Sequence, residues 1–208
     1  MKPRAPRREE REAPPRRWPV VLLSGAGAGV SGYLGVTQLA GGAALFCTVG
    51  SGCDVVRASR YAVFLGLPTA LWGAGLYGLI GGLVLSGLLA RRWSAVLLLS
   101  VVGVSFSLYL TYLELFVIKA LCAYCLVSAG IALVLFGVLL WQRPIPVGRR
   151  SPVRTARIAS LGAITAVVTV VIGAAIFAME APREAAPYQD ALARHLAASG
   201  AIMYGAYW

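Results

Sequence analysis

The sequence predicts an all-α integral membrane protein with five transmembrane helices. Of its 208 residues, 59% are hydrophobic and only 13% are charged, whereas soluble domains carry about 25% charge. The charges are also clustered, and five long segments have none: 18–53, 61–90, 93–113, 120–142 and 158–179. Because about 20 apolar residues cross a hydrocarbon core, each segment can supply one crossing. A soluble core would not need five such runs in succession.

The expected helices follow these runs. We place them at 20–39, 62–90, 94–117, 122–141 and 158–178. The small residues of "SGAGAGVSGYLG" lie inside the first span, where they allow another helix to approach closely. A dinucleotide-binding glycine loop is disfavoured because no strand precedes this pattern. The first run is also too long, and lacks the cleavage site, for a signal peptide.

The distribution of basic residues predicts the orientation in the membrane. Most of the 19 basic residues precede the first span, or lie between spans two and three or spans four and five. The other connections have fewer basic residues and several acidic ones. The positive-inside rule therefore predicts a cytoplasmic N-terminus and an external C-terminus. Nucleic acid is not an expected partner, because no set of stacking aromatic residues accompanies the basic runs.

The segments outside the spans differ in composition. Residues 1–17 are rich in proline and charge and are expected to form a disordered cytoplasmic tail. Residues 143–157 are a cytoplasmic linker with three prolines, which discourage a continuous helix. Residues 179–208 are external. There a polar linker precedes "ALARHLAASGA", which has helical spacing, and "IMYGAYW", which has the pattern of a short buried strand.

Four cysteines are the candidates for chemistry. Cys47 and Cys53 flank "TVGSG" between spans one and two, and Cys122 and Cys125 form a Cys-x-x-Cys motif where span four opens. The predicted topology puts all four on the external side, where an oxidising compartment favours disulfides. Two inert disulfides or a four-thiolate zinc site are alternatives. Haem attachment is disfavoured because Leu126, not His, follows Cys125.

A redox function explains this arrangement best. A helix N-terminus favours the thiolate form of Cys122, and a second thiol three residues on can resolve a mixed disulfide. The glycine-rich loop can carry its cysteine pair between a water-soluble donor and the membrane-edge pair. A lipid-soluble quinone is the natural electron acceptor at this depth. We therefore predict a membrane thiol–quinone oxidoreductase, with a non-catalytic scaffold held by structural disulfides as the alternative.

The combination of motifs resembles a known family. The loop cysteine pair, "CDVVRASRYAVFLGLPTALWG" and the late "CAYC" are similar to the bacterial vitamin K epoxide reductase (VKOR) family over residues 18–142. The resemblance implies a four-helix catalytic bundle around a quinone of the ubiquinone or menaquinone type, with 158–178 as an additional helix. It also implies an enzyme of the bacterial inner (plasma) membrane that generates disulfide bonds for exported proteins.

The resemblance implies a role for each cysteine. Cys122 and Cys125 match the active-site pair, with Cys125 nearest the quinone. Cys47 matches the thiol that meets the redox partner, and Cys53 the thiol that exchanges with Cys122. Ser59 matches a polar residue near the quinone, although a cap of the second span is an alternative role.

Other residues are candidates because of their position in the sequence alone. Phe64 and Trp72 lie closest to the matched motif and could line an aromatic quinone pocket. Glu114 and Lys119 are expected to be interfacial charges, with a proton role as the alternative. Reduction of vitamin K epoxide is disfavoured, because the chain has no Asn and Ala129 stands where the vertebrate enzymes have a substrate-binding Tyr.

The last residues carry a second resemblance. In many bacterial members a fifth helix leads to a thioredoxin-like domain, and "HLAASGAIMYGAYW" looks like the beginning of such a domain. We expect a sequence truncated before the first cysteine of a C-terminally fused thioredoxin-like oxidoreductase, which would be the redox partner. An amphipathic external tail is the alternative.

Overall fold

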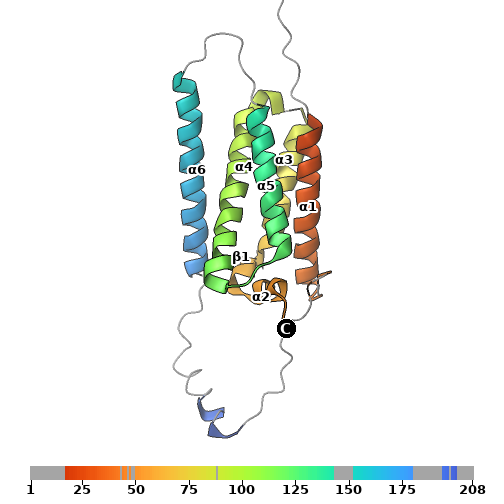
Figure 1. The fold of residues 1–208 in the computed structure, drawn as a ribbon, viewed down its shortest axis with the longest axis vertical. Coiled ribbons are helices and arrows are strands. Elements are labelled where there is room, and N and C mark those ends of the chain that lie inside the picture. The colour runs from red at the N-terminus through yellow and green to blue at the C-terminus, as the bar shows by residue number, and fades with distance from the viewer. Residues whose placement is uncertain are drawn as a thin grey trace, which may run out of the picture.

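The protein is a helical bundle with its short elements gathered at one end (Figure 1). The computed structural model describes residues 17–42, 44–45, 47, 50–87, 89–142, 152–179, 194–196 and 198–200. Within this part of the chain the long helices are α1 (Arg17–Leu39), α3 (Thr69–Leu85), α4 (Leu89–Tyr112), α5 (Ala123–Trp141) and α6 (Pro152–Met179). The short helix α2 (Gly52–Ala58), a 3-10 turn (Arg60–Ala62) and the hairpin β1 (Val63–Phe64) with β2 (Leu67–Pro68) lie where α1 and α4 end. We call this the cysteine end.

The chain is a multi-pass integral membrane protein. By length and composition, four described helices can cross a bilayer: Arg17–Leu39, Trp93–Ile118, Ala123–Trp141 and Ala156–Met179. Large apolar side chains on these helices are exposed, as expected of surfaces that face lipid. The remaining apolar helix, Thr69–Leu85, has 17 residues. It is about 25 Å long, somewhat less than the ~30 Å of a hydrocarbon core.

The second predicted span is therefore shorter than the sequence indicated. We expected a helix over 62–90, but residues 63–68 form a tight hairpin that pairs Val63 with Pro68 and Phe64 with Leu67. Its two central residues, Leu65 and Gly66, have φ of 52° and 76°. Positive φ at both positions gives the turn that matches the twist of a two-stranded ribbon. At the other end, Gly87 has a φ of 77°, which stops the helix.

The bundle is held by close contact between α1 and α3. The buried residues of α1 include the small residues Ser24, Gly27, Ser31 and Gly35. A Cβ atom added at Gly27 would lie only 2.7 Å from the ring of Tyr77 on α3. Small residues thus let the two helices approach, as the sequence predicted.

The apolar core fills the half of the bundle away from the cysteine end. It is built by residues of α1, α3, α4 and α5, including Ile80, Val96 and Leu135. The indole of Trp93 on α4 donates a hydrogen bond of 3.0 Å to the carbonyl of Leu139 on α5. Every polar group buried in a core needs such a partner.

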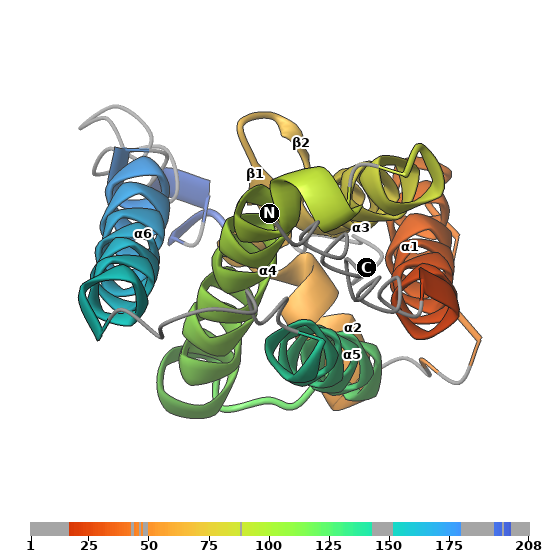
Figure 2. The same cartoon turned by 90° about the horizontal axis from the view of Figure 1, so that it is seen from above.

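Helix α6 stands beside α4 at the edge of the bundle, as Figure 2 shows from above. It begins at Pro152, six residues earlier than predicted, because proline is tolerated in the first turn of a helix. At the cysteine end its Phe177 contacts the rings of Tyr61, Phe64 and Tyr109. Most of the predicted tail 1–17, the linker 143–157 and the external segment 179–208 lies outside the described residues.

Candidate redox site

Cys122 and Cys125 lie at the N-terminus of α5. Cys122 is the N-cap residue, and its sulfur accepts a hydrogen bond of 3.4 Å from the backbone N–H of Cys125. Both are free thiols, and Cys122 is only 1% exposed. A hydrogen bond from the Cys125 thiol lowers the pKa of the Cys122 thiol, and the N–H of Cys125 acts in the same direction, whereas burial and the nearby Glu114 oppose them. The geometry favours Cys122 as the nucleophilic thiol of the pair.

The loop cysteines form a disulfide. The Cα atoms of Cys47 and Cys53 are 5.6 Å apart, and Cys53 lies in the first turn of α2. This helix begins after Ser51, whose side chain accepts a hydrogen bond from the N–H of Asp54. A disulfide sulfur is not a thiolate ligand, so the four-thiolate zinc alternative does not fit this arrangement.

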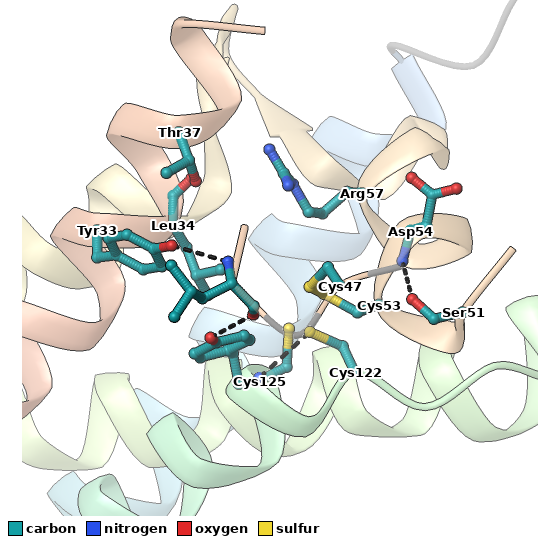
Figure 3. Close-up of a disulfide and its surroundings, with 12 residues drawn as sticks. Tyr33, Leu34, Thr37, Cys47, Ser51, Cys53, Asp54, Arg57, Cys122 and Cys125 are labelled. Carbon is teal, nitrogen blue, oxygen red and sulfur yellow. Dashed lines mark hydrogen bonds between the residues drawn. A yellow bond between two sulfur atoms is a disulfide. The ribbon is translucent and has the colours of Figure 1, made fainter. Parts of the chain in front are cut away.

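The two cysteine pairs are packed against each other (Figure 3). Cys47, Cys53 and Cys122 belong to one buried cluster, and Cys125 packs against it. The backbone of Gly52, next to Cys53, lies so close to the backbone of Leu121, next to Cys122, that any Cβ atom at Gly52 would overlap it. The fold thus places the loop disulfide beside the thiol with which the sequence predicted it to exchange.

Two tyrosines from different helices hold the loop in this position. The N–H of Leu45 donates a hydrogen bond of 2.8 Å to the hydroxyl of Tyr33 on α1. The hydroxyl of Tyr124 on α5 donates one of 2.6 Å to the carbonyl of Leu45. Arg57 on α2 adds a third attachment through a hydrogen bond of 2.9 Å from its Nη2 to the carbonyl of Gly42.

A buried carboxyl group lies beneath the free thiols. Glu114 is 2% exposed, and its Oε2 accepts a hydrogen bond of 3.2 Å from the backbone N–H of Cys122. The thiol of Cys125 is within hydrogen-bonding reach of both the Glu114 carboxyl group and the Cys122 sulfur. Glu114 stands in a π-helical turn, Leu113–Ile118, that continues α4. Such turns interrupt the regular helix and are frequent at functional sites.

A cavity opens next to the thiols. Its volume is about 130 Å³, and Cys122, Cys125, Glu114 and Arg57 are among its lining residues. Most of the remaining wall is apolar and includes Leu34, Val56, Leu110 and Ile118. The Nε of Arg57 is buried and has no hydrogen-bond partner among the described residues. A buried donor without a partner is costly, so an acceptor atom in the cavity, from water or from a ligand, would stabilise it.

The structure separates the other predicted site residues from this cavity. Within the described part of the chain, Ser59, Phe64 and Trp72 are not among its lining residues. Ser59 caps the C-terminus of α2, and its hydroxyl donates to the carbonyl of Val56 at 2.7 Å, so the cap that it forms belongs to α2 rather than to the second span. The ring of Phe64 packs edge-on against those of Trp72 and Phe106. Phe106 does line the cavity.

Sequence reasoning missed Tyr33, Tyr124 and Arg57 as parts of the site. The two tyrosines carry no signal in the sequence, because their role depends on the path of a loop that neither adjoins. Arg57 lies four residues after Cys53, one turn along a helix, and this spacing could have indicated that the two share a face.

The comparisons with known proteins agree with this geometry. Residues 18–140 match the model of the vitamin K epoxide reductase family. The chain belongs to this family. It is also 31% identical, over 198 residues, to the thiol-disulfide oxidoreductase LTO1 of Arabidopsis thaliana. That alignment covers 85% of the chain and 52% of the relative, so the chain spans about half the length of the curated relative that it matches.

Family membership bears on the chemistry expected of the site. The chain belongs to an oxidoreductase family and is homologous to a thiol-disulfide oxidoreductase. Vitamin K, for which the VKOR family is named, is a quinone. The matched segment contains the cysteines, Glu114 and every residue that lines the cavity.

Proposed function

We propose that the protein is a membrane thiol–quinone oxidoreductase that passes electrons from Cys47 and Cys53 to Cys122 and Cys125 and then to a quinone. The observation that carries the proposal is the packing of the Cys47–Cys53 disulfide against the free thiol of Cys122. The three residues belong to one buried cluster, and thiol–disulfide exchange needs such proximity, because a thiolate must attack a disulfide sulfur directly.

The exchange steps balance in atoms and electrons. A partner dithiol gives two electrons and two protons to the loop disulfide and becomes a disulfide itself. The Cys53 thiolate then attacks Cys122 in the oxidised membrane pair, and Cys125 leaves with the electron pair. Attack of Cys47 on Cys53 releases Cys122 and re-forms the loop disulfide. A loop disulfide and two free thiols, the arrangement in this structure, are the products of these steps.

The cavity fits the ring of a quinone. An engineered cavity of about 150 Å³ in another protein binds benzene, and the volume here is about 130 Å³. Leu34, Val56 and Ile118 would pack on the ring, and the unpartnered Nε of Arg57 would donate to one of its oxygens. The quinone supplies the electron sink, because it takes up two electrons and two protons to become a hydroquinone. The thiol of Cys125 lines this cavity and is within hydrogen-bonding reach of Glu114.

The wider setting of the reaction follows from the sequence. The positive-inside pattern supports an orientation in which the cysteine end faces the exterior, which is the periplasmic side if the protein lies in a bacterial inner membrane. There, a thioredoxin-like oxidoreductase would deliver electrons taken from exported proteins as their disulfides form. A purely structural scaffold would need no cavity beside its cysteines, whereas Cys122 and Cys125 both line one.

The decisive experiment measures anaerobic quinone reduction by two variants, in each of which one cysteine is replaced by alanine. Cys125→Ala should abolish quinone reduction with every donor, yet still form the Cys53–Cys122 mixed disulfide. Cys47→Ala should lose reduction by a thioredoxin-like partner, yet retain it with a small dithiol that reaches the membrane pair directly. Turnover near the wild-type rate in Cys125→Ala would show that the proposed relay is wrong.

A further inference from the structure

We propose that Glu114 is the base that takes the thiol proton of Cys125 when the membrane pair is oxidised. The sequence indicated an interfacial charge at this position, but the structure buries Glu114 to 2% exposure, beside the two thiols and in the wall of the cavity. The inference deepens the proposed function, since it concerns a residue of the same site.

The position of Glu114 is fixed on both sides. The backbone N–H of Cys122 donates to its Oε2 at 3.2 Å, which ties the carboxyl group to the start of α5. In the π-helical turn, the N–H groups of Lys119 and Ala120 both donate to the Glu114 carbonyl. The turn ends at Lys119, whose φ of 57° bends the chain towards Cys122. This local geometry brings a carboxyl group of α4 to the cysteines of α5.

The surroundings leave Glu114 able to accept a proton. No lysine or arginine makes a salt bridge with it among the described residues, where its hydrogen-bond partners are the N–H of Cys122 and the thiol of Cys125. Arg57 and Tyr61 face the same cavity from α2 and the 3-10 turn, and Lys119 follows on the same segment but is exposed. Taking up a proton therefore breaks no ion pair.

The order of events makes Glu114 the acceptor at one particular step. The Cys125 thiol can donate either to the Cys122 sulfur or to the Glu114 carboxyl group. Once Cys122 is joined to another sulfur, it is no longer an anionic acceptor, and Glu114 remains. Cys125 then loses its proton to Glu114 as its sulfur attacks Cys122 and the joined sulfur leaves with the electron pair. Oxidation by a quinone involves no joined sulfur. The two electrons released as the Cys122–Cys125 bond forms would pass to the quinone, with one proton from Cys125 by way of Glu114 and the other from the Cys122 thiol or from water, and the Glu114 carboxylate is restored.

The same residue serves the step in which the loop pair delivers electrons to the membrane pair. When Cys53 attacks Cys122, Cys125 leaves as a thiolate inside a buried site. Protonated Glu114 can return the proton to this sulfur, so that no free charge pair is left in the membrane edge. A base or acid within hydrogen-bond reach contributes about 10²–10⁴-fold to the rate of such steps.

The test needs no quinone. In a Cys47→Ala/Cys53→Ala variant only Cys122 and Cys125 remain of the four cysteines. Reaction of the reduced protein with 4,4′-dithiodipyridine releases one thiopyridone as Cys122 is joined and a second as Cys125 displaces the reagent from it. The two phases are followed by absorbance from pH 4 to 9, and Cys125→Ala identifies the second phase by its loss.

Glu114→Gln keeps the size of the side chain and an acceptor for the Cys122 N–H but cannot take a proton. We expect it to slow the second phase by about 100-fold near neutral pH, within the range for a general base. The first phase should not be slowed, because loss of the Glu114 charge removes an influence that raises the pKa of the Cys122 thiol. In the parent variant the second phase should rise with pH and level off as the carboxyl group ionises. In Glu114→Gln it should rise tenfold per pH unit until the thiol itself ionises.

Two further variants complete the design. Lys119→Gln removes the nearest exposed charge and should leave both phases unchanged, and Glu114→Asp should restore part of the second phase. The proposal is wrong if the second phase is as fast in Glu114→Gln as in the parent variant. It is also wrong if Glu114→Gln slows both phases equally and lowers the melting temperature. Because the reagent replaces the quinone, this result stands apart from the proposed function, which fails instead if the wild-type protein reduces no quinone.

Discussion

The backbone of Gly52 lies directly against the backbone of Leu121, and each residue adjoins a cysteine of the exchange. A Cβ atom at Gly52 would lie 3.0 Å from the Leu121 nitrogen and closer still to its carbonyl oxygen. Gly52→Ala should therefore push the loop pair away from Cys122 and slow electron transfer between the pairs at least 10-fold. A small dithiol that reduces the membrane pair directly should be unaffected.

The matched control is Gly130→Ala on α5, where an added Cβ atom meets nothing within 4 Å. Stopped-flow reduction of the membrane pair by the reduced loop pair would measure both variants. Equal rates in Gly52→Ala and the wild-type protein would show that the two backbones can separate without cost.

The tyrosine pair that holds Leu45 should restrain the loop. Tyr33→Phe and Tyr124→Phe each remove one hydrogen bond to the Leu45 backbone, worth about 0.5–1.5 kcal/mol. We expect hydrogen–deuterium exchange in the loop to become about 2–10-fold faster in either variant. Tyr112→Phe is the control, because its exposed hydroxyl makes no hydrogen bond with the described residues. If hydrogen–deuterium exchange in the loop is unchanged in both Tyr33→Phe and Tyr124→Phe, the role assigned to these hydroxyls is wrong.

The hydrogen bond between the two free thiols predicts a shift in reactivity with pH. The Cys125 thiol lowers the pKa of Cys122, so Cys122 should remain reactive below the pH at which an ordinary thiol, with a pKa of about 8.5, becomes protonated. Cys125→Ala removes this donor and should move the alkylation profile of Cys122 to higher pH. The measurement is the rate of carbamidomethylation of Cys122 by mass spectrometry in reduced, quinone-free protein. A profile that stays in place would show that the backbone N–H alone sets the pKa.

The unpartnered nitrogen of Arg57 predicts an effect on quinone binding. Arg57→Gln removes a charged donor from the cavity wall, and hydrogen bonds to charged groups are worth about 1.5–3 kcal/mol. We expect the KM for quinone to rise by at least 10-fold while kcat with saturating quinone changes less. Trp72→Phe tests the competing prediction from the sequence. A larger rise in KM for Trp72→Phe than for Arg57→Gln would show that the quinone binds at the aromatic residues Phe64 and Trp72 instead.

The orientation in the membrane can be tested at the two ends of α3. Arg60 and Ser86 are both exposed and lie beyond opposite ends of this helix. In a cysteine-free background, Arg60→Cys should react with an impermeant maleimide in intact cells, whereas Ser86→Cys should react only after lysis. The reverse pattern would place the cysteine end in the cytoplasm.

The sequence predicted the helices and the cysteine pairs because both depend on local patterns. Charge-free runs and a Cys-x-x-Cys motif are visible without any tertiary contact. The hairpin at 63–68 was not predicted, because it depends on a positive φ at Leu65, a residue type that rarely adopts one. Glu114 was predicted to be an interfacial charge, because no sequence pattern predicts the π-helical turn that places its side chain beside Cys122. Phe64 and Trp72 were assigned by their closeness along the chain to the matched motif, and their part in quinone binding stays a prediction.

The aromatic contacts of Phe177 have a consequence for encounter rates. They anchor α6 at the cysteine end, so the chain after Met179 leaves the helix on the face where the loop disulfide lies. A dithiol carried by that chain would meet Cys47 as a tethered reactant, at an effective concentration in the millimolar range for a short linker. Its rate of exchange would then be independent of dilution, and tight docking between the two surfaces would be unnecessary.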